Sequence, residues 1–346
     1  GRSRDLPFYT TTRRFNYQNY YRTATRDWLN RAPEPTPSHV AFIESWAKRT
    51  IMTPPRMSAY IDKNMEIQHI IQNFAAVDDI CWYSIDEGFV DLTESLSYFY
   101  PDKNLTPAQK LDAISHDIQV AIYQQTGLYA TIGMSIGNPL LAKLSLDNAA
   151  KHTPNMRALW TYDTIAETVW QIPDLTDFWG ISRRTAKRLR RLGVNTIYEL
   201  AHTHPAVLKK EFGVLGVQLY CHANGIDESR VSKKYEAKRK SIGNSQTLPR
   251  DYAVRQEIEL VISELAEQVA IRTRRAKKKT CLVSLYVGFG FSEGKSSIHA
   301  QMAVEPTNST QKLTQAVLTL FREKYASGAV RRIGVSYGQL CEADVE

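Results

Sequence analysis

Apolar residues between positions 58 and 151 recur with two alternating periods, one typical of helices and one typical of strands. The expected helices cover residues 58–74, 106–126 and 138–151, and the expected strands cover Ile80–Ile85, Phe89–Thr93 and Tyr129–Ile136. Thr106-Pro107 and Asn138-Pro139 each place a capping residue before a proline, as at many helix starts. The short Asp86-Glu87-Gly88 segment predicts a tight hairpin turn. The order α, ββ, α, β, α is most of a ferredoxin-like domain that lacks its first strand.

The second half of the chain has two further patterns. Residues 171–227 predict short helices interrupted by glycines, and a polar, basic connector follows. The remainder predicts strands at 241–248, 280–291, 297–304 and 330–338, with helices at 254–275 and 310–325. In the strand at 280–291, Ser284, Tyr286 and Gly288 alternate with apolar residues, so one face is expected to be buried. We therefore expect an α+β multidomain protein in which a small all-α domain precedes a βαββαβ domain.

The composition is that of an ordinary folded protein, with 346 residues of which 43% are hydrophobic and 23% charged. This length predicts two or three domains, and no apolar run approaches the ~18–20 residues of a membrane span. The four cysteines lie far apart without a CxxC pair, which fits neither a zinc ribbon nor a disulfide framework and suggests a reducing cytosol. A net charge of +8 favours a polyanionic partner and gives no reason to expect a membrane.

Two adjacent carboxylates, Asp86 and Glu87, lie at the predicted hairpin between apolar strands. Like charges at this separation repel each other, so the pair suggests a divalent cation, and Mg²⁺ prefers carboxylate oxygens. The alternative is a solvated acidic turn, because Asp and Gly are common turn residues.

A strand that runs into a helix start at Asn138 precedes a helix with lysines near both ends. Lys151, at the far end, could reach a phosphate as a flexible point charge. The alternative is a simple ion pair on the helix surface between Asp147 and Lys151, which are four residues apart.

Basic residues are concentrated in two places that suggest a nucleic-acid partner. The Gly180-Ile181 turn precedes a helix that carries Arg183, Arg184, Lys187, Arg188, Arg190 and Arg191 with no acid among them. Backbone N–H groups at such a turn can seat a phosphate, so this segment resembles a helix-hairpin-helix that grips the DNA backbone without reading its sequence. A second group comprises Lys240, Ser241, Gly243, Arg274, Arg275, Lys277 and Lys278. For both groups the alternative is a solvated, solubilising surface.

Taken in order, these segments resemble the Y-family translesion DNA polymerases, closest to the UmuC-like branch of Gram-positive bacteria. The resemblance covers about residues 52–340. It is carried by the phrases Ser-Ile-Asp-Glu-Gly-Phe-Val-Asp-Leu-Thr, Gly-Met-Ser-Ile-Gly with Leu-Leu-Ala-Lys-Leu-Ser, Trp-Gly-Ile, Lys-Ser-Ile-Gly-Asn and Pro-Pro-Arg-Met. It implies a palm, a helix-hairpin-helix thumb and a little finger. The expected ranges are 1–51 for a fingers remnant or insertion, 52–170 for the palm, 171–228 for the thumb, 229–240 for a basic linker and 241–346 for the little finger.

The resemblance also implies an activity and its parts. The chain would be a DNA-directed DNA polymerase of the error-prone translesion type, bacterial and cytoplasmic. Asp86 and Glu87 would be catalytic metal ligands for two Mg²⁺ ions, and Lys151 would contact the triphosphate of the incoming nucleotide. The partners would be primer-template DNA, deoxynucleoside triphosphates and a sliding clamp, bound through a C-terminal motif that is not found after Gln339.

The departures from the family pattern lie at the front of the chain. An Asp-Met-x-x-Phe-Tyr-like phrase, which would supply the first catalytic aspartate and the steric-gate aromatic, is not found, so we interpret the chain as N-terminally incomplete and expect it to be inactive alone. One alternative is a non-catalytic DNA-binding or partner protein that keeps the thumb and little finger. Another is a different helix-hairpin-helix repair enzyme, such as a nuclease or glycosylase.

Overall fold

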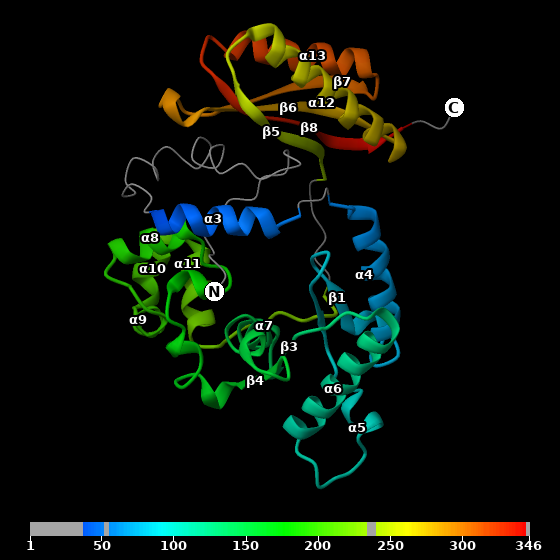
Figure 1. The fold of residues 1–346 in the computed structure, drawn as a ribbon, viewed down its shortest axis with the longest axis vertical. Helices are drawn as coiled ribbons and strands as arrows, with labels where there is room; N and C mark the ends of the chain where they lie inside the picture. The colour runs from blue at the N-terminus through cyan, green and yellow to red at the C-terminus, as the bar shows by residue number, and fades with distance from the viewer. Residues whose placement is uncertain (1–36, 52–54, 234–239, 344–346) are drawn as a thin grey trace. The chain divides into compact units, whose positions relative to one another are not determined.

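The computed structural model describes residues 37–51, 55–233 and 240–343 (Figure 1). Most of the expected fingers segment, residues 1–36, lies outside the described residues; its end forms the helix α3 (Pro37–Arg49). The chain divides into two compact units. We call residues 56–235 the central unit and residues 236–346, which belong to the other, the C-terminal unit. Of the described helices, none is both long and apolar enough to cross a membrane.

The first part of the central unit is built around one long amphipathic helix. The elements are α4 (Met57–Ile71), β1 (Ile80–Trp82), β2 (Gly88–Val90), α5 (Leu96–Phe99) and α6 (Pro107–Thr126). Helix α6 begins with a capping box between Thr106 and Gln109 and ends at Gly127, which has the left-handed φ of 71° that favours glycine. Its Ile114, Ile118 and Ile122 are buried against α4 and the β1–β2 hairpin, so this stripe forms the core.

The second part of the central unit pairs β3 (Ile132–Ile136) with β4 (Arg157–Thr161) in parallel, and α7 (Pro139–Asn148) packs on them. A Cβ at Gly133 would lie 2.1 Å from the Ala142 carbonyl oxygen, so only glycine permits this close helix–strand approach. The sequence did not predict β4, because these five residues begin with arginine and show no alternation of apolar and polar positions. Within the described residues the β1–β2 and β3–β4 pairs form separate two-stranded sheets.

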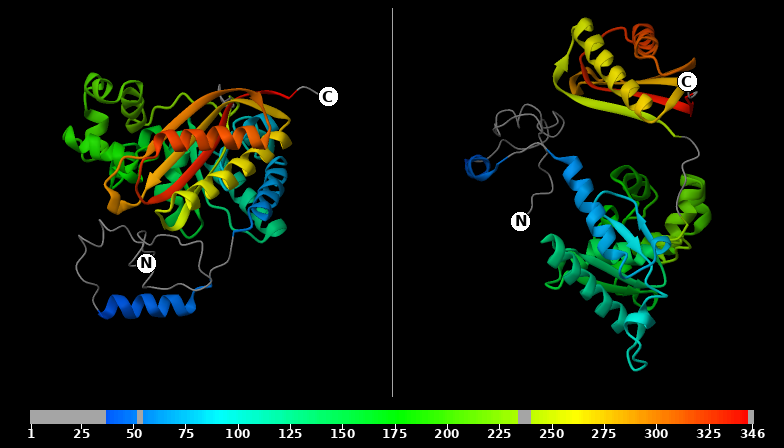
Figure 2. Two further views of the ribbon diagram at one scale, coloured as in Figure 1. Left: turned by 90° about the horizontal axis from the view of Figure 1, so that it is seen from above. Right: turned by 90° about the vertical axis from the view of Figure 1, so that its right-hand side faces the viewer.

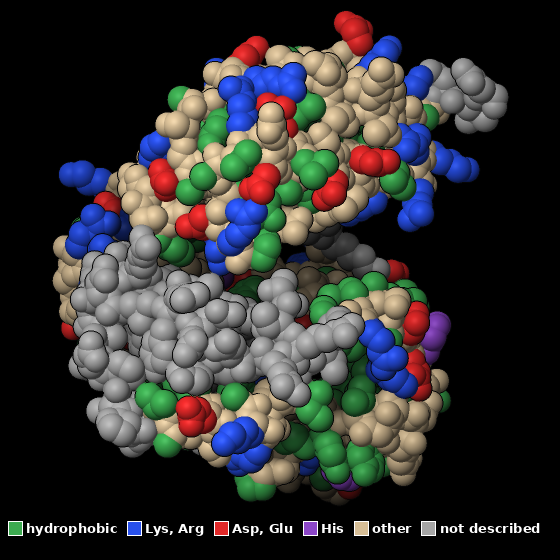
Figure 3. All heavy atoms as spheres, turned by 45° about the horizontal axis from the view of Figure 1, so that its top comes forward, with side chains coloured by type: hydrophobic (Ala, Val, Ile, Leu, Met, Phe, Trp, Pro, Cys, Tyr) green, Lys and Arg blue, Asp and Glu red, His purple; other side chains and the backbone are tan. Residues whose placement is uncertain are grey.

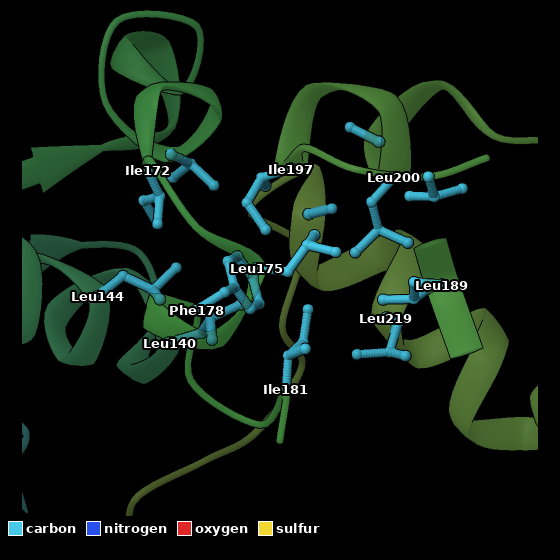
Figure 4. Packing of buried hydrophobic residues seen from close by; sticks show 14 of the residues in the cluster. Leu140, Leu144, Ile172, Leu175, Phe178, Ile181, Leu189, Ile197, Leu200 and Leu219 are labelled. Carbon is cyan, nitrogen blue, oxygen red and sulfur yellow. The ribbon is translucent and has the colours of Figure 1, made fainter. Parts of the chain in front are cut away.

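Short helices complete the central unit: α8 (Arg183–Arg191), α9 (Ile197–His202), α10 (Pro205–Phe212) and α11 (Val214–Ala223). Their buried side chains share one core with α7, and Figure 4 shows Leu140 and Leu144 of α7 beside Leu175 and Phe178. Helix α7 therefore packs on the β3–β4 pair through one part of its surface and on this core through another. The palm–thumb boundary at residue 170 stays a prediction.

The C-terminal unit is a four-stranded antiparallel sheet with two helices. The elements are β5 (Ile242–Tyr252), α12 (Arg255–Arg275), β6 (Lys278–Phe289), β7 (Ile298–Thr307), α13 (Thr310–Lys324) and β8 (Val330–Glu342). The strand order is β5-β8-β6-β7, and both helices lie on one face of the sheet (Figure 2). Val283, Leu285 and Val287 of β6 are buried in the core beneath these helices, whereas Ser284 and Tyr286 point the other way. The expected βαββαβ order is confirmed.

Candidate active site and nucleic-acid interface

The two adjacent carboxylates lie in the loop that joins β1 to β2. Trp82 pairs with Gly88, so the loop covers residues 83–87 and is longer than the three-residue turn that the sequence predicted. Gly88 is the first residue of β2, and a Cβ there would lie 2.8 Å from the Trp82 ring, so glycine leaves room for that ring. The side-chain amide of Asn64 in α4 donates to the Ile85 carbonyl oxygen at 2.9 Å and thereby anchors the loop tip.

The two carboxylates have different surroundings. Asp86 is exposed, and its carboxylate accepts a hydrogen bond from the Ser84 hydroxyl at 2.9 Å. Glu87 is half-buried and uses both oxygens: one is 2.8 Å from Nζ of Lys143, and the other accepts from the Tyr83 hydroxyl at 2.8 Å. Partial burial and this hydrogen bond raise the pKa of Tyr83 to about 12, so it stays a donor at neutral pH. Glu87 is thus fixed in orientation, and Asp86 faces solvent.

Lys143 organises this site, and the sequence did not single it out. It lies on α7 and is only 5% exposed, and its ammonium also contacts Asp147 at 3.1 Å. Burial lowers the pKa of Lys143, but the hydrogen bonds to Glu87 and Asp147 outweigh this effect and hold it above its usual value. The sequence does indicate one of the two contacts, because Asp147 follows Lys143 by four residues on the same helix. It does not indicate the other, because Glu87 lies on a different element.

Lys151 lies in the short 3-10 turn that follows α7. Its Nζ is 2.6 Å from Asp147, so the surface ion pair that was the alternative interpretation is present, while 46% of the side chain remains exposed. Together with Lys143 these contacts form an alternating row of charges, Glu87–Lys143–Asp147–Lys151, which we call the charge row. Contact between Lys151 and a phosphate stays a prediction.

The two loop carboxylates remain the predicted ligands of a metal ion. No group of three or more Asp, Glu, His or Cys side chains suited to a metal occurs in the part of the chain that the structure describes. One or two carboxylates are nevertheless a usual protein contribution to a Mg²⁺ site, where water and substrate phosphates supply the other ligands. The exposed Asp86 carboxylate and the fixed Glu87 carboxylate fit this donor set.

The basic helix of the central unit is α8, and its cations are not equivalent. Gly180 has a φ of +95°, and Ile181 is buried in the core, so both shape the turn before the helix; Ser182 caps it by accepting from the Thr185 N–H. The expectation that these cations lack counterions was wrong for two of them, because acids on other elements approach the helix. Arg188 contacts Glu211 at 2.8 Å, and Arg190 contacts Asp174 at 2.8 Å. Arg183, Arg184, Lys187 and Arg191 are exposed.

The predicted contact residues of the C-terminal unit divide in the same way. Arg274 donates to the Asn308 carbonyl oxygen and to the Thr310 hydroxyl, both at 2.8 Å, and Lys278 pairs with Glu342. The remaining members of the predicted set are exposed to solvent: Lys240, Ser241, Gly243, Arg275 and Lys277. On the face seen in Figure 3, basic and acidic side chains are interspersed over this unit. The exposed basic side chains of the C-terminal unit can therefore contact a polyanion, but they do not define a specific binding site.

Comparisons with known proteins identify relatives of this chain. The model of the impB/mucB/samB family matches residues 38–147, and that of the impB/mucB/samB family C-terminal domain matches residues 239–346. The chain is 32% identical to the putative UV-damage repair protein UvrX of Bacillus subtilis over 84% of this chain and 66% of that one. It is 35% identical to DNA polymerase IV 2 of the same organism over 85% of this chain and 69% of that one.

The chain thus spans about two thirds of the length of these relatives. Among solved structures, the Y-family DNA polymerase chimera Dbh-Dpo4(243-245)-Dbh matches with a TM-score of 0.64 and 19% identity over 84% of this chain and 79% of that one, which supports the fold. On the family models and the relatives above 30% identity, this chain belongs to the impB/mucB/samB family, the Y-family translesion DNA polymerases.

Proposed function

We propose that this chain carries the nucleotidyl-transfer site of a bacterial, cytoplasmic translesion DNA polymerase, which extends a primer on damaged template DNA with deoxynucleoside triphosphates. The observation that carries the proposal is the carboxylate pair at the β1–β2 loop, in which Lys143 and Tyr83 fix Glu87 and leave Asp86 open to solvent. The relative named DNA polymerase IV 2 supports the reaction, and the relative named a putative UV-damage repair protein supports the damaged template.

Asp86 and Glu87 are the residues that would hold the divalent metal. Two Mg²⁺ ions, when bound, stabilise the attacking and leaving oxygens of an in-line phosphoryl displacement. The protein's part is positional: the Lys143 ammonium and the Tyr83 hydroxyl hold Glu87 in one orientation before substrate arrives. Asp86 needs to give up only its hydrogen bond from Ser84 to become a ligand.

The substrates would be bound by cations of the same central unit. Lys151 is partly exposed and its Nζ contacts Asp147, so an incoming triphosphate would compete with one partly exposed ion pair, which is worth at most about 1 kcal/mol. The turn at Gly180–Ser182 and the exposed cations of α8 would grip the DNA backbone, since they can approach phosphates without reading base edges. Binding should therefore be salt-sensitive and insensitive to sequence.

The test is primer extension by the protein expressed from its complete gene, with Asp86→Asn and Glu87→Gln as variants. Both should abolish Mg²⁺-dependent extension and leave primer-template affinity unchanged. Asp91→Asn is the matched control, because the Asp91 side chain is an exposed carboxylate near the same loop and accepts hydrogen bonds from the backbone N–H and the hydroxyl of Thr93.

Three outcomes separate the possibilities. Extension by Asp86→Asn would refute the metal assignment. DNA binding without extension by the unaltered protein would favour the non-catalytic DNA-binding interpretation. The 346-residue chain, assayed alone, should bind DNA and extend no primer, because the two loop carboxylates can serve one Mg²⁺ ion but are too few for the two ions of the proposed reaction.

A further inference from the structure

Two cysteines that the sequence places far apart are neighbours on the sheet of the C-terminal unit. Strands β6 and β8 run antiparallel, and Lys279 of β6 lies directly opposite Cys341 of β8. Cys281 is two positions further along β6, so its side chain points to the same face and lies diagonally across from Cys341. The Cys341 thiol donates to the carbonyl oxygen of Lys279, the residue two positions before Cys281, at 3.7 Å.

The backbone near this pair departs from a regular ladder. Diagonal residues in a regular antiparallel pair have Cα atoms ~7–8 Å apart, whereas a disulfide needs about 4.4–6.8 Å. Gln339 of β8, however, has a φ of 47°, which breaks the extended conformation just before Cys341. Beyond Cys341 the strand pairing continues through Lys278 and Glu342 to the bond from the Ala343 N–H to the Lys277 carbonyl oxygen, so Cys341 lies near the end of the described β6–β8 pairing.

The surroundings make the pair accessible but slow to react. Both cysteines are partly exposed, so a small reagent can reach them. Burial, with smaller contributions from Cys341 and Glu305, raises the pKa of the Cys281 thiol, so less of it is thiolate at neutral pH. The other two cysteines, Cys81 on β1 and Cys221 on α11, belong to the central unit, so neither competes for this pair within the C-terminal unit.

We propose that Cys281 and Cys341 form a modification site, a reversible intrachain disulfide between β6 and β8 made by exchange with a low-molecular-weight disulfide. The thiolate of one cysteine attacks a sulfur of the reagent and releases one small thiol. The second cysteine then attacks the mixed disulfide and releases the other small thiol. Two protein thiols lose two electrons and two protons, and the reagent gains them as two thiols. This site is independent of the nucleotidyl-transfer chemistry, and its bond joins the strand ends beside Lys277 and Lys278.

The test uses the full chain with Cys81→Ser and Cys221→Ser, which leaves only the proposed pair. Incubation of the folded protein with glutathione disulfide should lower the intact mass by two hydrogen atoms, remove both titratable thiols and yield a linked Cys281–Cys341 peptide. Dithiothreitol should restore both thiols. Adding Cys341→Ser gives the matched control, in which Cys281 should stop at a stable glutathione adduct.

The cross-link should also raise the urea midpoint of the C-terminal unit, since it restricts the unfolded chain. Persistence of two free thiols in the folded chain would overturn the proposal. Adducts at both cysteines without a linked peptide, or a disulfide between two chains, would overturn it as well.

Discussion

Replacing Lys143 by methionine tests whether the charge row is a structural support of the carboxylate site. Methionine keeps most of the buried volume of the side chain and removes its charge, so the change isolates the contacts to Glu87 and Asp147. Each hydrogen bond from a charged group is worth about 1.5–3 kcal/mol, which gives an upper limit near 3–6 kcal/mol for the two. The side chains of Glu87 and Asp147 are 29% and 26% exposed, so water can solvate their carboxylates once the lysine is gone. We therefore expect a loss of about 2–3 kcal/mol in unfolding free energy.

Urea unfolding followed by tryptophan emission is a suitable assay. Four of the six tryptophans, Trp82, Trp160, Trp170 and Trp179, lie in the central unit, so the signal reports mainly on the unit that contains Lys143. Lys151→Met is the matched control, because its partly exposed ion pair with Asp147 should contribute ~0.5 kcal/mol or less.

A double-mutant cycle then identifies the partner. Combining Lys143→Met with Glu87→Gln should show a coupling free energy of about 1–2 kcal/mol. The reasoning fails if the unfolding free energy of Lys143→Met lies within about 0.5 kcal/mol of that of the unaltered chain. It also fails if the effects of the two changes are additive, because Lys143 then does not hold Glu87.

Three further outcomes are expected. Replacing Arg183, Arg184 and Lys187 together by alanine should weaken DNA binding for all sequences. The slope of log K against log salt, measured by fluorescence anisotropy, should become shallower by about 2–3. An unchanged slope would show that α8 is not part of the interface. Gly133→Ala should lower the unfolding free energy by about 1–3 kcal/mol or more in urea, because the new methyl group meets backbone rather than a movable side chain; an unchanged midpoint would contradict the close packing. Burial, partly offset by Asp227, lowers the pKa of His222, so the unfolded chain binds a proton more readily than the folded chain. The free energy of unfolding should therefore fall as the pH drops below about 6.5. His222→Gln should remove this pH dependence of the urea midpoint, and its persistence would point to another group.

The fold was predictable wherever local patterns were strong. The C-terminal unit alternates long amphipathic helices with long strands, so its order followed from periodicity alone. Strand β4 was missed because a five-residue strand without alternation carries no such signal. The predicted position of the hairpin turn was wrong because Gly88 was interpreted as a turn residue. In the structure Gly88 lies in the strand and leaves room for the Trp82 ring.

The candidate site was predictable only in the parts that are contiguous in sequence. Asp86 and Glu87 are adjacent and lie within a family phrase, although their role as metal ligands remains a prediction. Lys143 could not be assigned, since the contact that defines it joins two elements that are far apart in the chain. The pairing of Arg188 was hidden for the same reason, because its carboxylate partner Glu211 comes from a later helix.

The core shared by α7 and helices α8–α11 has a consequence for recombination between related genes. Leu140, Leu141 and Leu144 of α7 pack with side chains as distant as Leu219, so an exchange near residue 170 would join halves of two different cores and leave mismatched volumes. An exchange at the junction between residues 235 and 236 would instead transfer the C-terminal unit with its own core complete. Hybrids of such genes should therefore survive selection mainly when they inherit α7 and helices α8–α11 from one parent, whichever parent supplies the C-terminal sheet.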